Sequence, residues 1–192
     1  VRTKLNYKKG EYDVKYFARE QIDALALAIF QAENGGAMIV GDQTGIGKGR
    51  VAAGMLRYAY YKGQVPIFVS KNPSLFSAMI EDLYDIGTPE LADAVEFTAN
   101  SLNFKDHLGR KHHTTALKQR AIVNKITQTG KLPKGKKVLF TTYKQFLDTR
   151  GSYTAKQKAQ LKRQKQAPEN HYREDMMDAL TRGDNATIVL DE

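Results

Sequence analysis

The stretch "AMIVGDQTGIGKGRVAAGMLRYAYY", residues 37–61, decides the fold. A short apolar run (37–40) precedes a glycine-rich turn (41–50), and a run with helical spacing (51–63) follows. This order predicts a buried strand, a tight turn and a helix. Backbone N–H groups at such a turn converge on one point, where the helix dipole also favours an anion. Lys48 can reach phosphate oxygens from the start of the helix, so the stretch predicts a nucleotide-binding loop.

The loop departs from the usual phosphate-binding pattern G-x-x-x-x-G-K-[ST] at two positions. Asp42 stands at the first glycine, and Gly49 stands where a Ser or Thr would offer its hydroxyl to Mg²⁺. A tight strand-to-helix turn without a ligand is the alternative reading. The candidate nucleotide-binding residues in the loop are Asp42, Gln43, Thr44, Gly45, Ile46, Gly47, Lys48, Gly49 and Arg50.

Further apolar runs predict strands at 65–70, 94–97, 136–143 and 186–192, and amphipathic segments predict helices at 18–36 and 73–87. Strands that alternate with helices favour a mostly parallel sheet covered on both faces. The sequence therefore predicts an α/β fold with three layers. The chain starts at Val1 and stops just after a predicted strand, which suggests a fragment of a longer protein.

Two polar features lie beside the loop in this scheme. The last predicted strand ends in Asp191 and Glu192. Asp191 is expected to hold Mg²⁺ through water, and Glu192 to orient or deprotonate an attacking water. Upstream, the amide of Gln21 can read adenine while Phe17 packs on the base, although a polar residue at a helix start is the simpler alternative. The strand-end pair and the loop both fall at carboxyl ends of predicted parallel strands, where open α/β sheets bind ligands.

Composition points to a polyanionic partner. The 192 residues carry a formal net charge of +9 and no cysteine, which excludes disulfides and thiolate metal sites. Between Lys105 and Lys137, ten Lys or Arg accompany one acidic residue, Asp106. This stretch and "KQKAQLKRQK" (156–165) are interpreted as surface elaborations, with a solvated face as the alternative. No apolar run is long enough to cross a membrane and no signal peptide is visible. The expected organisation is a basic arm (1–15) and one domain (16–192) with basic insertions at about 103–137 and 148–183.

Five segments, in this order, resemble superfamily 2 helicases and translocases, in particular the strawberry notch group and its bacterial and phage relatives. They are "FAREQIDALALAI" (17–29), "GDQTGIGKGRVAAGMLRYA" (41–59), "FVSKNPSLFSAMIEDLYDIG" (68–87), "VLFTTY" (138–143) and "IVLDE" (188–192). Loops in that family read much like "GDxTGxGKGR", so Asp42 and Gly49 look like family variants. Since Gly49 offers no hydroxyl, Mg²⁺ is expected to be held by phosphate, water and Asp191, with Thr44 as a further candidate.

The resemblance implies the first RecA-like domain of a P-loop NTPase motor, truncated after its metal-binding strand, that uses ATP and Mg²⁺ to move on or remodel nucleic acid. It implies a catalytic set of Lys48, Asp191 and Glu192. It also implies nucleic-acid contacts by Ser70, Lys71, Asn72, Thr141, Thr142 and Tyr143.

DNA is favoured over RNA, and the expected place is the cytoplasm of a bacterial or phage-infected cell. A second RecA-like domain, absent from this chain, is expected to complete the site, so that the fragment alone hydrolyses ATP poorly. Two alternatives stay open: a nucleic-acid-binding module that has lost ATPase activity, and a P-loop kinase.

Overall fold

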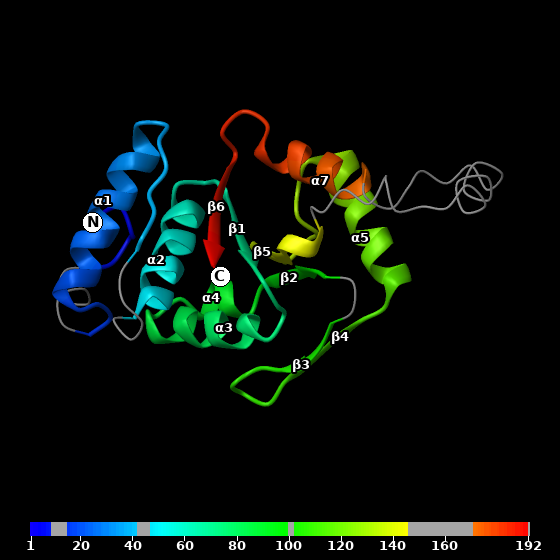
Figure 1. Ribbon diagram of the computed structural model, residues 1–192, viewed down its shortest axis with the longest axis horizontal. Coiled ribbons are helices and arrows are strands. Elements are labelled where there is room, and N and C mark those ends of the chain that lie inside the picture. Colours follow the sequence, from blue (N-terminus) through cyan, green and yellow to red (C-terminus); the bar gives the residue numbers. More distant parts are fainter. Residues whose placement is uncertain (9–14, 42–46, 100–101, 146–170, 192) are drawn as a thin grey trace.

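A four-stranded parallel sheet forms the centre of the molecule (Figure 1). The computed structural model describes residues 1–8, 15–41, 47–99, 102–145 and 171–191. The strand order is β2-β5-β1-β6, with bounds Val95–Thr98, Val138–Thr142, Val65–Ser70 and Ala186–Asp191. Every pair of neighbours is parallel. The predicted α/β fold with a mostly parallel sheet is therefore confirmed.

Helices cover both faces of this sheet. One face carries α1 (Arg19–Glu33), α2 (Lys48–Tyr61), α3 (Leu75–Asp85) and the short α4 (Pro89–Ala92), whose apolar residues form one core cluster with the sheet. The other face carries α5 (Ala116–Thr129) and α7 (His171–Thr181), which contribute to a second cluster. Strand β1 contributes side chains to both cores, because Phe68 packs in the first cluster whereas Ile67 and Val69 pack in the second. The three layers follow from this alternation.

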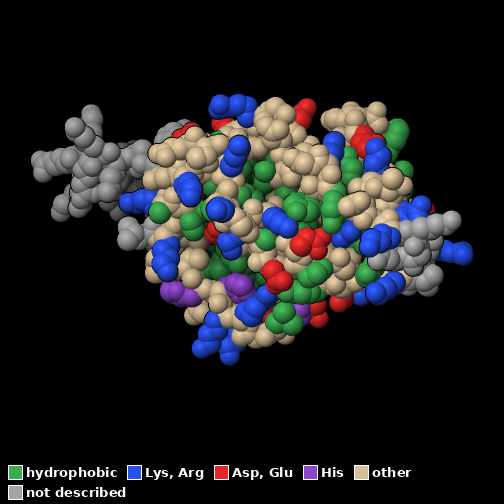
Figure 2. Space-filling model, turned by 180° about the vertical axis from the view of Figure 1, so that it is seen from behind, with side chains coloured by type: hydrophobic (Ala, Val, Ile, Leu, Met, Phe, Trp, Pro, Cys, Tyr) green, Lys and Arg blue, Asp and Glu red, His purple; other side chains and the backbone are tan. Residues whose placement is uncertain are grey.

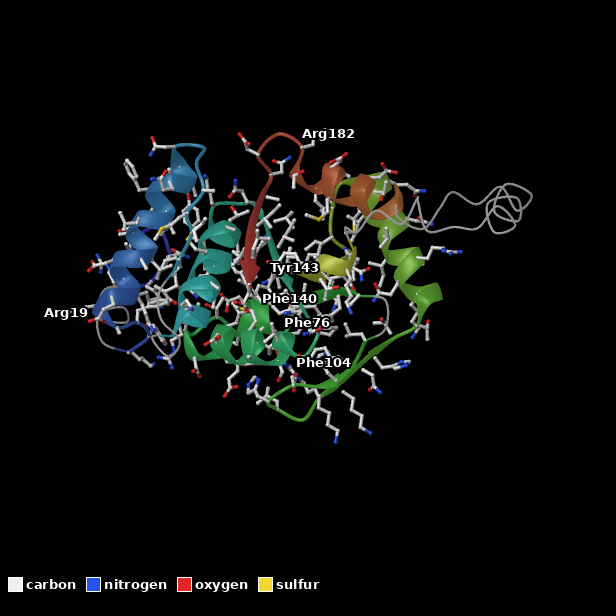
Figure 3. The ribbon with its side chains drawn as sticks, viewed as in Figure 1. Arg19, Phe76, Phe104, Phe140, Tyr143 and Arg182 are labelled. Atoms are coloured by element: carbon white, nitrogen blue, oxygen red, sulfur yellow. The ribbon has the colours of Figure 1, made fainter. Side chains whose placement is uncertain are left out.

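A separate antiparallel hairpin, β3 (Leu102–Lys105) and β4 (Lys111–Thr114), extends from the domain and was not predicted. Phe104 anchors the hairpin to the domain. Its ring packs edge-on against Phe76, with 6.1 Å between the centroids, and Phe76 in turn packs against Phe140 of β5 (Figure 3). At its turn, Asp106 accepts hydrogen bonds from the Arg110 guanidinium at 2.6 Å and lies 2.9 Å from His112 Nε2. The hairpin is thus part of the folded domain.

The predicted strand at 37–40 does not form. These residues have no regular structure, and the side chain of Ile39 is 93% exposed, although Val40 packs against the first core cluster. A strand needs a neighbour for its backbone N–H and C=O groups, and 37–40 has none in the part of the chain that the structure describes. Strand β6 is itself an edge strand, with Ile188 and Leu190 exposed.

Two segments that were interpreted as surface features also contribute residues to the cores. The basic stretch 105–137 is more than a surface elaboration, because Val123 and Ile126 of α5 are buried in the second core cluster. Their apolar stripe is hard to recognise among the surrounding lysines and arginines.

The expected basic arm (1–15) is not detached over its first eight residues, because Leu5 and Tyr7 are buried in the first core. Arg57 of α2 holds this segment by donating hydrogen bonds to the backbone oxygens of Leu5 and Asn6. Within the described ranges, no helix combines the length and apolar character that a membrane crossing requires.

Candidate nucleotide-binding site

Three sequence motifs end level with one another at the carboxyl edge of the sheet. Ser70, the last residue of β1, is in register with Thr142 of β5 on one side and with Asp191 of β6 on the other. Because the three strands are parallel, their carboxyl ends lie at the same edge of the sheet. The edge therefore gathers the ends of three strands that are far apart in the sequence.

Helix α2 begins beside this edge, at the end of the glycine-rich loop. Gly47 caps the helix with φ 73° and ψ 42°, a left-handed conformation that favours glycine. Lys48, Gly49 and Arg50 form the first turn, where backbone N–H groups have no carbonyl partner four residues earlier in the helix, and the Arg50 N–H donates to the Gly47 backbone oxygen at 3.0 Å. The candidates Asp42, Gln43, Thr44, Gly45 and Ile46 lie outside the described residues, as does Glu192.

Gln21 packs directly against this helix start. Its Nε2 donates to the Gly47 backbone oxygen at 3.4 Å, while its Oε1 accepts from the Ala18 backbone N–H at 3.0 Å. A Cβ on Gly47 would lie only 2.3 Å from Gln21 Nε2. The amide is buried and caps the start of α1, as the simpler reading (a polar residue at a helix start) expects, and the role of Gln21 in reading adenine stays a prediction.

Phe17 does not stand ready to pack on a base. Its side chain is buried in the first core cluster, where it meets the Tyr7 ring edge-on at 6.2 Å. Its place is fixed by packing against α1 and α2, which spacing alone does not reveal. The prediction that Phe17 stacks on adenine is wrong for this conformation of the chain.

The structure adds a residue that no sequence pattern singles out. Asp82 of α3 lies against the first turn of α2, such that a Cβ on Gly49 would be 2.1 Å from its Oδ2. Burial raises the pKa of Asp82 to about 6, helped by the neighbouring carboxylates of Asp85, Glu81 and Asp191 and opposed by Arg50. Helix α2 packs on both α3, which carries Asp82, and β6, which ends in Asp191.

These groups fit a hard divalent cation. Asp82 supplies carboxylate oxygens beside the helix start where phosphates would bind, and Asp191 ends β6, the strand on which α2 packs. Among the described residues, no three His, Cys, Asp or Glu side chains come together as a metal cage. Mg²⁺ rarely uses such a cage, since it takes one or two carboxylates together with substrate phosphates and water. The donor set thus suits a magnesium–nucleotide complex and not a self-sufficient metal site.

The candidate nucleic-acid contacts separate into buried and exposed residues. The Thr141 hydroxyl donates to the Thr98 backbone oxygen at 3.0 Å, and the Thr142 hydroxyl accepts from Gln145 Nε2 at 3.3 Å. Both threonines are buried, and so is Ser70, whose hydroxyl donates to the Asn72 backbone oxygen at 2.9 Å. These three hydroxyls hold the strand ends in place.

Lys71 and Asn72 are exposed and Tyr143 is half-buried at the start of the 3₁₀ turn η1 (Tyr143–Gln145). Of the six candidate contacts, these three have side chains that a ligand can reach. They lie directly after β1 and β5, at the edge where Asp191 ends β6.

A parallel α/β sheet whose glycine-rich loop leads into a helix beside an acidic strand end defines the class of P-loop NTPases. The chain belongs to the family described as P-loop containing NTP hydrolase pore-1, whose model matches residues 14–169. Comparison with curated proteins and with solved structures gave no match. Membership supports nucleotide binding and hydrolysis, chemistry in which positioning and charge stabilisation at the phosphates do most of the work.

Proposed function

We propose that this chain is the first RecA-like domain of a superfamily 2 motor of the strawberry notch type, which couples ATP hydrolysis to movement on nucleic acid. The observation that carries the proposal is the meeting of Gln21, the start of α2 and the end of β6 at one edge of the sheet. Motors of this class use these elements, in this order along the chain, around one nucleotide.

In the proposed site, Lys48 and the backbone N–H groups of the first turn bind phosphates, and Asp191 helps to hold Mg²⁺. Bound Mg²⁺ would neutralise charge that develops on the phosphates. Glu192 would orient or deprotonate the attacking water, and the loop residues 42–46 would help to bind the nucleotide. A second RecA-like domain is proposed to complete the site, since arginines supplied from outside can contribute about 10³–10⁵ in rate.

The nucleic-acid partner is supported by position and charge. Lys71 and Asn72 are exposed immediately after β1, next to the proposed nucleotide. The formal charge of +9 favours a polyanion. Lys and Arg side chains are spread over the back of the molecule and form no single patch there (Figure 2).

The test is a calorimetric titration of the chain with ATP and Mg²⁺, compared with Lys48→Ala. Binding by the natural sequence and its loss in the variant would support the proposal. Lys62→Ala, at the opposite end of the same helix, is the matched control and is expected to bind as the natural sequence does.

The nucleic-acid half needs its own measurement, because a binding module without ATPase function would also bind a polyanion. Binding of single-stranded DNA is measured over a range of salt concentrations, with and without ATP and Mg²⁺. A motor domain is expected to change its DNA affinity when nucleotide binds, and Lys48→Ala is expected to abolish that change. DNA binding that ignores both nucleotide and Lys48 would instead identify a binding module.

A further inference from the structure

Gly49 occupies the position where the usual loop carries a Ser or Thr, and its missing side chain has a structural counterpart. A Cβ added there would lie 2.1 Å from Asp82 Oδ2, 3.0 Å from Asp82 Cγ and 3.4 Å from Asp82 Oδ1. Carbon and oxygen atoms that are not bonded do not approach to 2.1 Å. The carboxylate of Asp82 therefore already fills the space that a residue-49 side chain would enter.

The surroundings of Asp82 contain more negative than positive charge. Asp85, Glu81 and Asp191 act on it with like charge, and Arg50 opposes them. The Arg50 guanidinium is committed to Asp85, with 2.9 Å between Nη2 and Oδ2. Among the described residues, no hydrogen bond or ion pair to the Asp82 carboxylate is found. A half-buried carboxylate among like charges is costly unless a cation reaches it.

We infer that Asp82 takes the place of the missing loop hydroxyl and, together with Asp191, holds the Mg²⁺ of the bound nucleotide. This assignment rests on the proposed function, because it needs a nucleotide at the start of α2. The oxygen comes from α3 instead of from the loop itself, and Gly49, which has no side chain, leaves it room. Hard cations accept a carboxylate oxygen in place of a hydroxyl.

A carboxylate in this position has a consequence that a hydroxyl lacks. Without a divalent cation, Asp82 and Asp191 both repel the phosphates of ATP. With the cation bound, both attract the complex. Nucleotide affinity is therefore expected to depend strongly on Mg²⁺, and neutralising Asp82 is expected to weaken binding of ATP with Mg²⁺ while strengthening binding of ATP without it.

The experiment measures the ratio of the ATP dissociation constants in EDTA and in Mg²⁺, by titration of the protein. Asp82→Asn is expected to lower this ratio by about 10- to 100-fold, the range typical of groups that support a metal. Asp178→Asn is the matched control, because it removes the same charge from an exposed position of α7, on the other face of the sheet, and is expected to leave the ratio unchanged. A merely structural role for Asp82 would weaken both affinities together.

A second pair of variants tests the substitution of one oxygen by another. Gly49→Ser alone collides with Asp82, whereas Gly49→Ser combined with Asp82→Ala places a hydroxyl in the vacated space. The double variant is expected to regain Mg²⁺ dependence relative to Asp82→Ala, and no recovery would count against the assignment.

If Asp82→Asn leaves the ratio of the ATP dissociation constants in EDTA and in Mg²⁺ unchanged, Asp82 does not hold the cation. The proposed nucleotide site would still be supported in that case if Lys48→Ala abolishes ATP binding. If the natural sequence binds no ATP in either buffer, the proposed function fails and the role of Asp82 fails with it.

Discussion

Replacing Gly47 by Ala tests whether the loop and Gln21 are built as one unit. Two costs add at this position. The φ of 73° is left-handed, which costs a residue with a Cβ about 1–2 kcal/mol. The new Cβ would also lie 2.3 Å from the buried Gln21 Nε2, and relieving such overpacking costs about 1–3 kcal/mol. Gly47→Ala is therefore expected to lower the free energy of unfolding by about 2–5 kcal/mol and to weaken ATP binding.

Gly63, just beyond the other end of α2, provides the control. Its φ is 83°, but no atom lies within 4 Å of a Cβ built there, so Gly63→Ala is expected to show only the backbone cost of about 1–2 kcal/mol. Urea unfolding of both variants gives the comparison. Adding Gln21→Ala to Gly47→Ala removes the collision, so the double variant is expected to lose less than the sum of the single effects. If Gly47→Ala costs no more than Gly63→Ala, the close packing of Gln21 on the loop is refuted.

Three further variants separate stability from binding. Asp106→Asn is expected to lower the free energy of unfolding by about 2–3 kcal/mol, less than a fully buried pair would lose because Arg110 is partly exposed. Burial alone would raise the pKa of Asp106, but hydrogen bonds from His112 and Arg110 outweigh it and hold the pKa well below its usual range. The stabilisation is thus present above the unfolded pKa of about 3.9 and lost as pH falls toward the folded value, and Asp106→Asn is expected to remove that part of the pH dependence in acid unfolding curves. Thr141→Val, which removes a buried hydrogen bond, is expected to cost about 1–2 kcal/mol in urea unfolding without changing DNA affinity. Lys71→Ala is expected to leave the free energy of unfolding within about 0.5 kcal/mol and to weaken DNA binding, with a salt slope smaller by about 1. A change in DNA affinity for Thr141→Val and none for Lys71→Ala would contradict this division between stability and binding.

The sequence by itself determined the fold class and predicted where the candidate nucleotide site lies. Apolar runs and glycine stops located β1, β2, β5 and β6, because buried strands of a parallel sheet need continuous apolar residues that local composition reveals. The glycine-rich turn and Lys48 predicted a phosphate-binding helix start from local sequence alone. This was possible because the backbone geometry of the turn depends on which residues occupy it. Family membership then confirmed the class.

Only the tertiary structure decided which side chains reach the site. The run 37–40 has the composition of a strand, but a strand also needs a neighbour, and no local pattern provides one. Packing between α1 and α2 buries Phe17 in the core and brings the amide of Gln21 to the start of α2. Asp82 comes to Gly49 from another helix, 33 positions along the chain, through the packing of α3 on α2. Spacing along the sequence fixes neighbours on one element, whereas contacts between elements depend on how their faces pack, and these contacts decided what surrounds the nucleotide loop.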